Sequence, residues 1–490
     1  MVDVKTGLVE IFGKENVLDA PETLEAYAKD ESFVHPLKPR FVVRPKNTEE
    51  VQELVRWAKQ TRTPLVPVSS GAPHFRGDTV PSAPGAVIVD LSGMNKIIKI
   101  NRRNRLAIIE PGVTYSQLQP ELAKEGLCLS TTLIPRANKS VLASLLEKEP
   151  RLIPRFQWAI LDPLRCIEVV WGDGQKLVTG NAENASIEAV EANLKRGQAQ
   201  FIATGPGQTD FYRLVSAAQG SMGIVTWATV KCEVLPQIHK TFFVTSEKLK
   251  DLHDFTYKIL RFRFGDELMI LNNFSLACVL GNSPDEIREL REDLPTWIAI
   301  VGVAGRDRLA KERVEFQEQD ISDIARSFGL QLKNEIPGTR SSEVLRAINN
   351  TSREPYWKLG YKGGCQEIFF VTTLEKTSEF VRSMYSVAEG QGYNPSDIGV
   401  YIQPIHQGAS CHCEFILPFD REDQREMAKM QVLFEKASEE LHRQGAFFSR
   451  PYGMWADLAF NRDVQTTNTL KKIKGIFDPN NIMNTGKLCF

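Results

Sequence analysis

The chain has 490 residues, 42% of them hydrophobic, which is enough for about two to four domains around a large buried core. Its formal net charge at pH 7 is −1. Such an even balance gives no basis for binding nucleic acid or for general attraction to an anionic membrane.

Cysteine usage and the N-terminal segment bear on the cellular compartment. The eight cysteines are scattered through the chain, which favours reduced thiols and a cytoplasmic protein. Residues 1–20 mix acids and bases, and no run of about eighteen apolar residues occurs to span a membrane. The neighbours Cys411, His412 and Cys413 suggest a metal, but no Cys-x-x-Cys partner completes four ligands. We therefore predict a buried strand there and no bound metal.

Residues 39–100 alternate strand, helix, loop and strand, as an α/β nucleotide-binding unit does. The loop at 67–81 contains the small residues Ser69, Ser70, Gly71 and Ala72. Successive backbone N–H groups in such a loop form a concave nest for phosphate oxygens, and small side chains let a ligand approach closely. An ordinary turn is the alternative. The pattern indicates a diphosphate site that is neither a P-loop nor a Gly-x-Gly-x-x-Gly turn.

Residues 106–236 carry further strands and helices. Asp173-Gly174 between alternating apolar residues is a strong hairpin signal. Glycines at 220 and 223 permit a backbone to pass flat against a planar ligand. The predicted elements are a strand at 106–110 ending in the turn Pro111-Gly112, a helix at 115–126, a helix at 141–146 with Ser140 as a candidate cap, a hairpin at 166–179 and a helix at 210–217.

Beyond residue 236 the pattern indicates a second α/β layer. Its predicted strands lie at 240–246, 296–304, 366–372, 398–403 and 411–418, and its helices at 251–263, 306–328, 377–391 and 420–445.

Segments at 39–45, 67–81, 110–114, 135–142, 172–174, 220–225 and 478–487, taken in this order, resemble one flavoprotein family. It is the family of vanillyl-alcohol oxidase and p-cresol methylhydroxylase, which includes FAD-linked D-lactate and glycolate dehydrogenases. The resemblance covers the first half and the C-terminal residues well, and the middle loosely. It implies an α+β fold: a two-subdomain FAD-binding domain of the p-cresol methylhydroxylase type, and an α/β cap of antiparallel sheet with helices on one side. We expect the FAD-binding domain at 1–236 and 452–490, and the cap at 237–451.

The resemblance also implies which residues meet FAD. The main chain of Ile224 or Val225 is expected to read the adenine, and the Pro111-Gly112 turn to lie beside the adenosine half. Residues 151–165 depart from the family, so Arg155, Gln157 and Asp162 are open candidates to face the flavin. The full expected set is Pro67, Ser69, Ser70, Gly71, Ala72, Pro73, His74, Pro111, Gly112, Thr131, Pro135, Ser140, Ser144, Gly223, Ile224, Val225 and Lys487.

Two catalytic motifs of the family are altered here. Phenol-oxidising members carry a Tyr-Arg pair near the carboxyl end, where this chain has Trp455 and Ala456. Losing the arginine removes a bidentate cation that would stabilise a phenolate. Lactate and glycolate members bind a divalent metal through His-x-Gly-Asp-Gly-Asn-x-His. Residues 406–412 keep His406 and His412 at another spacing and without the acid.

The catalytic candidates are therefore His412, His406, Tyr452 and Arg450. His412, with His406, is expected to accept a proton or to attach the flavin covalently; a hydrogen-bonded strand histidine is the alternative. His74 is a second attachment candidate. A substrate carboxylate has candidate partners in Arg353, Tyr356, Lys358 and Arg450, unless these are surface charges.

The resemblance implies an FAD-dependent dehydrogenase or oxidase that oxidises a small alcohol or 2-hydroxy acid by hydride transfer. The alternatives are oxidation of a para-substituted phenol or related aromatic, and a flavin electron-transfer subunit of a larger complex. Expected partners are a small-molecule substrate and an electron-accepting iron–sulfur protein, cytochrome or electron-transfer flavoprotein, in a homo- or hetero-oligomer. No nucleic acid and no membrane span are expected.

Overall fold

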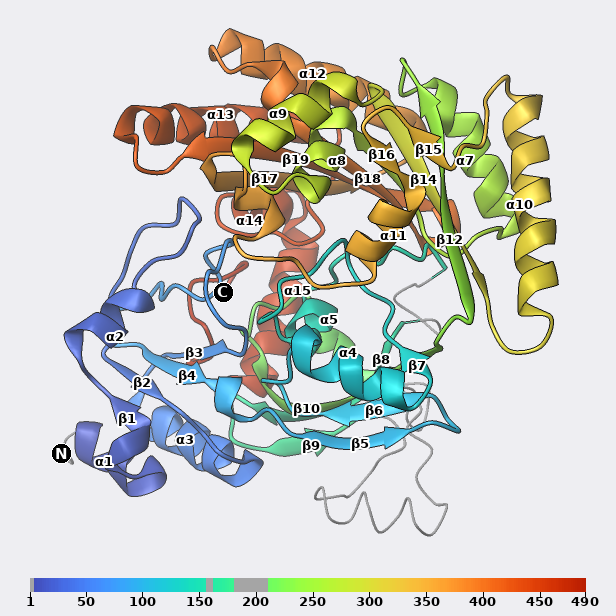
Figure 1. The fold of residues 1–490 in the computed structure, drawn as a ribbon. Coiled ribbons are helices and arrows are strands. Elements are labelled where there is room, and N and C mark those ends of the chain that lie inside the picture. The colour runs from blue at the N-terminus through green and yellow to red at the C-terminus, as the bar shows by residue number, and fades with distance from the viewer. Residues whose placement is uncertain (1–3, 156–161, 180–209) are drawn as a thin grey trace.

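A computed structural model describes residues 4–155, 162–179 and 210–490, which form two lobes (Figure 1). The described residues up to about 235 make the lower lobe in Figure 1, and the large antiparallel sheet with its helices makes the upper one. Among the described residues, no helix combines the length and apolar character needed to cross a bilayer.

The first sheet of the lower lobe positions the loop at 67–81. Asn47 accepts the N–H of Glu50 at 2.9 Å and caps α3 (Thr48–Thr61), which buries Val51 and Leu54 against the sheet. The loop begins at the end of the edge strand. In order, the strands are β1 (Val17–Leu18), β2 (Phe41–Val43), β4 (Val87–Asp90) and β3 (Leu65–Val68), the last three parallel; α1 (Val4–Phe12) and α2 (Pro21–Ala26) also belong here.

A second, antiparallel sheet completes the lower lobe. Val170 and Ile224 from this sheet join the hydrophobic core of the first sheet, so the two sheets pack as one unit. Its strands are β5 (Ile97–Asn101), β6 (Leu106–Ile109), β10 (Gly223–Lys231), β8 (Leu164–Trp171) and β9 (Lys176–Val178), with α4 (Tyr115–Lys124) and α5 (Val141–Leu146) alongside; β7 (Leu127–Cys128) pairs with β11 (Glu233–Val234).

The upper lobe is built on a six-stranded antiparallel sheet with apolar residues on both faces. The strands, in order, are β12 (Ile238–Ser246), β14 (Trp297–Gly305), β13 (Leu268–Asn272), β18 (Gly399–Ile405), β19 (Ser410–Asp420) and β17 (Gly363–Thr372). One face carries α7 (Asp251–Phe262), α10 (Ala310–Ser327), α12 (Thr377–Gly390) and α13 (Gln424–Arg443); the other carries α8 (Asn273–Leu280), α9 (Pro284–Asp293) and α11 (Ser341–Ile348), near the hairpin β15 (Glu335–Ile336) and β16 (Thr339–Arg340).

Three local predictions can be compared with these elements. The hairpin at 166–179 is confirmed, because β8 and β9 pair and the Gly174 N–H donates to the Trp171 carbonyl at 2.9 Å. The helix predicted at 210–217 is wrong: only a 3₁₀ turn, η4 (Phe211–Leu214), forms, and Ala217 has a φ of 56° that ends helical geometry. Helices also cover both faces of the upper sheet instead of one, since both faces are apolar.

The C-terminal residues return to the lower lobe after α14 (Trp455–Phe460) and α15 (Val464–Phe477). Met483 pairs with Leu65 of β3, and the Asn484 N–H donates to the Leu65 carbonyl at 2.8 Å. Lys487 donates to the Gly77 carbonyl at 2.7 Å. The chain end therefore secures both β3 and the loop that follows it. The exact boundaries at 236 and 452 stay a prediction.

Candidate functional site

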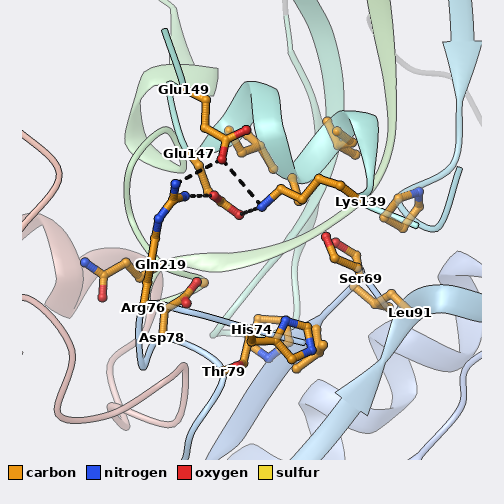
Figure 2. A pocket seen from close by; sticks show the side chains of 18 of the residues that line it. Ser69, His74, Arg76, Asp78, Thr79, Leu91, Lys139, Glu147, Glu149 and Gln219 are labelled. Atoms are coloured by element: carbon orange, nitrogen blue, oxygen red, sulfur yellow. Dashed lines mark hydrogen bonds and ion pairs between the residues drawn. The ribbon is translucent and has the colours of Figure 1, made fainter. Parts of the chain in front are cut away.

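A cavity of about 1300 Å³ lies between the lobes and is lined mainly by the lower one (Figure 2). Two kinds of wall enclose it. The backbone wall consists of small or apolar residues: Pro67, Val68, Ser69, Ser70, Pro111, Gly223, Ile224 and Val225. The ionic wall consists of Arg76, Lys139, Glu147, Glu149 and Glu367.

Hydrogen bonds behind the loop fix the backbone wall. The Ser70 Oγ accepts the Ser140 N–H at 3.1 Å, and the Ser140 Oγ accepts the Ala143 N–H at 3.0 Å, which caps α5. The Gly71 N–H donates to the Asn138 carbonyl at 3.0 Å, and a Cβ at Gly71 would lie 2.8 Å from the Asn138 Nδ2. Gly71 is therefore needed for packing against residue 138, and its N–H is already bonded.

The structure brings many of the predicted cofactor residues to the cavity. Those that line it are Pro67, Ser69, Ser70, His74, Pro111, Pro135, Gly223, Ile224 and Val225, with Tyr452 of the predicted catalytic set. The predicted residues outside the lining are Gly71, Ala72, Pro73, Gly112, Thr131, Ser140, Ser144 and Lys487.

Several of the residues outside the lining support those inside it. Ser144 is buried, and its Oγ donates to Glu149, a lining residue, at 2.5 Å. Gly112 passes under the turn of residues 91–94, where a Cβ would lie 2.5 to 2.8 Å from three carbonyl oxygens.

The ionic wall is a dense set of buried ion pairs (Figure 2). Arg76 forms ion pairs with Glu147, with Glu149 at 3.1 Å and with Glu367 at 3.8 Å. Lys139 contacts Glu147 at 2.6 Å. Burial alone would lower the pKa of Arg76, but Glu147 and Glu149 hold that pKa well above its usual value. Arg76 is therefore a permanent cation at this wall.

Two titratable groups on the loop are shifted toward their neutral forms. Burial, with a smaller contribution from Glu147, raises the pKa of Asp78 to about 6. Burial, with Arg136 and Lys139, lowers the pKa of His74 to about 4. His74 is thus a neutral imidazole facing the cavity at pH 7.

A second cavity of about 660 Å³ adjoins the first. Arg76, Glu367, Tyr452 and Phe75 line both cavities and form the junction between them. The second cavity is otherwise largely aromatic or apolar, through Phe33, Val34, Phe369, Phe434, Met454 and Trp455. Trp455, which stands where the family's Tyr-Arg pair begins, is therefore a wall residue here.

The remaining catalytic candidates lie away from the cavity lining. His412 is 3% exposed, and its Nε2 lies 2.9 Å from Glu414 Oε2. His406 is in the turn between β18 and β19, with Nδ1 2.8 Å from the Ser410 Oγ. Arg450 is buried with Cζ 4.0 Å from the Phe369 ring centroid, and its Nη1 has no hydrogen-bond partner among the described residues.

The other open candidates are dispersed. Arg155 pairs with Glu233 at 2.9 Å and Asp266 at 3.2 Å. Asp162 pairs with Lys148, and Gln157 lies outside the described residues. Arg353 bonds Asn282 and two carbonyls near the end of α8. Of the proposed carboxylate partners, Tyr356 lines the first cavity and Lys358 binds Glu367, which lines both.

Sequence reasoning missed the ionic wall and Asp78. Arg76 and Asp78 lie inside the loop that was singled out, yet their roles depend on partners far along the chain. The local signal available was the run Glu147-Lys148-Glu149 directly after a short apolar helix, because two acids following a buried helix need cationic partners nearby.

The side chains that line the cavity suit a bound flavin dinucleotide. Apolar side chains of Leu91, Pro111 and Ile224 provide surface for flat rings, and Ser69 with Lys139 provides polar and cationic groups for phosphate and hydroxyl oxygens. Gly220 has a φ of +69°, and a Cβ there would lie 2.4 Å from Pro67 Cγ. Only glycine therefore lets the backbone at 220 pack this closely against Pro67 in the cavity wall.

Comparison with known proteins agrees with this fit. The FAD binding domain family matches residues 39–137, and the C-terminal domain family of FAD linked oxidases matches residues 266–488. D-2-hydroxyglutarate dehydrogenase of Stutzerimonas stutzeri is 25% identical over 483 residues, covering 96% of each chain. The 4-cresol dehydrogenase [hydroxylating] flavoprotein subunit of Pseudomonas putida is 21% identical over 515 residues, covering 97% of this chain and 93% of that one.

A solved structure shows the same fold. The crystal structure of p-cresol methylhydroxylase with substrate bound superposes with a TM-score of 0.82 at 17% identity, covering 99% of this chain and 96% of that one. The sequence matches, the cavity and the fold agree with one another. The chain is therefore an FAD-linked oxidoreductase that carries the FAD binding domain and the C-terminal domain of FAD linked oxidases on a fold like that of p-cresol methylhydroxylase, with FAD as its cofactor.

Proposed function

We propose that the protein oxidises the hydroxyl-bearing carbon of a small alcohol or 2-hydroxy acid held at the junction of its two cavities. The observation that carries this proposal is the shared lining: Arg76, Glu367 and Tyr452 border both the cofactor cavity and the second, aromatic cavity. A substrate at this junction contacts charged and hydroxyl groups on one side and a water-excluding apolar wall on the other.

FAD, when bound, supplies the two-electron acceptor for the hydride. The chain's own residues orient the substrate and manage its proton. Burial raises the pKa of Tyr452 well above its usual value, so its hydroxyl is a neutral donor toward a substrate oxygen. The aromatic residues of the second cavity keep water from the reacting carbon.

Behind the lining of the second cavity lies a cation with one donor that is unsatisfied among the described residues. Arg450 has a buried Nη1 without a partner in the described residues, and it stacks on Phe369, which lines the second cavity. Burying an unpaired donor costs free energy, which a substrate carboxylate would recover. The similarity to a D-2-hydroxyglutarate dehydrogenase supports the same class of substrate.

Oxidation of a para-substituted phenol is the second candidate, and the aromatic lining favours it. Phe33, Phe75, Phe369, Phe434 and Trp455 surround the second cavity and would stack on a substrate ring. Tyr452 in the lining and Arg450 stacked on Phe369 would then supply a hydroxyl and a cation, at other sequence positions than the family's Tyr-Arg pair.

Anaerobic reduction of bound flavin tests both candidates. A panel of 2-hydroxy acids, simple alcohols and p-alkylphenols is mixed with the protein while the flavin absorbance is followed. We expect a 2-hydroxy acid to bleach the flavin, and Arg450→Met to raise its half-saturating concentration by about tenfold to a hundredfold. Arg353→Met should leave it unchanged, because Arg353 bonds carbonyls at the end of α8 and lines neither cavity. Bleaching by phenols alone would replace the first candidate with the second.

We propose that the electrons then pass to a protein partner, because the similar 4-cresol dehydrogenase chain is a flavoprotein subunit. A cytoplasmic location is proposed on the eight free cysteines. Comparing reoxidation of the reduced flavin by oxygen with reoxidation by soluble iron–sulfur proteins and cytochromes identifies the acceptor class.

A further inference from the structure

Four buried ionisable side chains form a continuous chain from the cavity junction into the upper sheet. Glu367 Oε1 accepts from Lys358 Nζ at 2.5 Å, and Lys358 also binds Glu414. Glu414 Oε2 lies 2.9 Å from His412 Nε2. The side chains are 11%, 8%, 6% and 4% exposed in the order Glu367, Lys358, Glu414, His412, so the chain leads inward from the cavity.

Strand register holds this chain in place. In the antiparallel pair of β17 and β19, Phe369 lies opposite Glu414 and Val371 lies opposite His412. Glu367 is two residues from Phe369, and His412 two from Glu414, so each pair projects from the same face of the sheet. The turn η5 (Trp357–Leu359) brings Lys358 between the two carboxylates.

The four groups together carry one negative charge. Burial lowers the pKa of His412, so the imidazole is neutral at pH 7. Burial opposes the ionisation of Glu414 and of Lys358, but their mutual attraction keeps the pKa of Glu414 low and that of Lys358 high. With Glu367 ionised against Lys358 and Arg76, the sum is two carboxylates and one ammonium. One more proton would make the group neutral.

Among the described residues, Glu147 and Glu149 share Arg76 with Glu367, and both also pair with Lys139. Arg76 and Arg450 are neighbouring cations: Glu147 and Glu149 hold the pKa of Arg76 above its usual value, whereas burial lowers the pKa of Arg450. Burial raises the pKa values of the neighbouring hydroxyls and thiols, which are therefore neutral; they are Tyr356, Tyr401, Cys365 and Cys411.

We propose that Glu367, Lys358, Glu414 and His412 act as an internal proton acceptor for the substrate hydroxyl. This inference rests on the proposed function. Glu367 is the catalytic residue, because it lines both cavities at the junction where the proposed substrate binds. Lys358, Glu414 and His412 act through it.

The proton transfers conserve atoms and charge. As the substrate carbon gives its hydride to the flavin, the substrate O–H bond breaks and its proton forms an O–H bond on Glu367. Glu367 passes a proton to Lys358 while Lys358 gives one to Glu414, and Glu414 gives one to His412. The substrate oxygen becomes a carbonyl. His412 ends as an imidazolium paired with the Glu414 carboxylate, and the four groups change from a net charge of −1 to zero.

Proton release and flavin reduction, followed together, test the proposal. Flavin-loaded protein is mixed anaerobically with the reducing substrate from the panel, in weak buffer containing a pH indicator. In the wild-type protein we expect flavin reduction without release of the hydroxyl proton, which appears later, when product leaves. In His412→Gln we expect that proton to appear during reduction. In the plot of flavin-reduction rate against pH, we also expect the inflection at the lower pH to move.

Two variants complete the design. Glu367→Gln should slow flavin reduction by about a hundredfold to ten-thousandfold, as expected for loss of a general base. His253→Gln is the matched control: His253 is another buried histidine of the upper lobe, with Nε2 3.1 Å from the Thr377 Oγ1, and it contacts neither cavity. Its pH profile should match that of the wild type.

The outcomes are distinct. Immediate release of the hydroxyl proton by wild-type protein, or an unchanged pH profile in His412→Gln, overturns the proton acceptor while leaving the proposed oxidation intact. Failure of every substrate in the panel to reduce the flavin overturns the proposed function, and this inference with it. If His412→Gln does not fold, the indicator measurement on the wild-type protein decides alone.

Discussion

The two walls of the cofactor cavity are built on different physical principles. The backbone wall holds its shape through short hydrogen bonds between main-chain and small side-chain groups, such as Ser70 to Ser140. The ionic wall holds its shape through charges brought together from distant parts of the chain, such as Arg76 with Glu147 and Glu367. The first wall is therefore sensitive to added side-chain atoms, and the second is sensitive to the removal of a charge.

This difference separates binding from chemistry within one cavity. A backbone wall offers fixed dipoles and close approach, which suit a cofactor that stays bound. In an ionic wall, one side chain can gain or lose a proton while the charges of its neighbours offset the change. Such a wall suits a substrate whose charge changes during the reaction. Substitutions in each wall should therefore fail in different ways.

Removing a cation from the buried ion pairs should have the largest effect. Lys358→Met leaves the Glu367 and Glu414 carboxylates buried without their common partner. We expect the free energy of unfolding to fall by about 3 to 5 kcal/mol. Denaturant titration of the purified variant measures the change.

The matched control restores neutrality. Adding Glu367→Gln and Glu414→Gln to Lys358→Met removes all three charges together, and most of the lost stability should return. A Lys358→Met variant as stable as the wild type would show that the buried charges around Glu367, a residue of the ionic wall, are not held by charge balance.

A single methyl group should be the largest disturbance to the backbone wall. At Gly112 a Cβ would lie 2.5, 2.7 and 2.8 Å from three backbone carbonyl oxygens, which cannot move without shifting residues 91–94. We expect Gly112→Ala to cost about 3 kcal/mol, at the upper end of overpacking effects, and to weaken FAD binding. Thermal unfolding and quenching of FAD fluorescence measure the two consequences.

Gly93 provides the control in the same turn. No atom lies within 4 Å of a Cβ built there, so Gly93→Ala should change neither stability nor FAD affinity measurably. Equal losses in both variants would mean that the turn, and not the contact at Gly112, is sensitive.

The sequence was informative for the backbone wall because its signals are local. Asp173-Gly174 predicted the β8–β9 hairpin, and the hydroxyl of Ser140 was a candidate cap that the structure shows bonded to Ala143. The α+β fold, the FAD cofactor and the oxidoreductase class followed from ordered local segments and are confirmed. Even here the reason for Gly71 differed, since its contact is with Asn138.

The ionic wall could not be predicted, because each pair joins residues far apart in sequence. Arg76 and Glu147 are 71 positions apart, and Glu367 comes from the other lobe. No periodicity or turn signal links such residues. His412 shows the same limit: alternation correctly placed it in a strand, but only the pairing of β17 with β19 shows that it reaches Glu414 and Lys358 instead of the cavity.

Asp78 should give a smaller, pH-dependent effect. Its pKa in the folded protein is raised to about 6 from an ordinary 3.8, so the folded state holds a proton that the unfolded state has lost. Stability contributed by this group is therefore present below about pH 4 and lost as pH rises through 6. Asp78→Asn in the cofactor-free protein should gain about 1 to 2 kcal/mol at pH 7.

The gain in Asp78→Asn should vanish at pH 4, where both states of the wild-type protein are protonated at this position. Unfolding curves at pH 4, 5.5 and 7 measure it. A constant difference across that range would assign the effect to packing and not to titration.

The smallest effect is expected for an ion pair outside both walls. Arg421 lies 2.9 Å from Glu31 and its side chain is 52% exposed, so solvent already screens the pair. Arg421→Ala should change the free energy of unfolding by no more than about 1 kcal/mol, and added salt should shrink even that difference. Denaturant titration at low and high salt checks this. A loss as large as that of Lys358→Met would mean that burial is not what distinguishes the ionic wall, because an exposed pair at the surface would then stabilise the two lobes equally well.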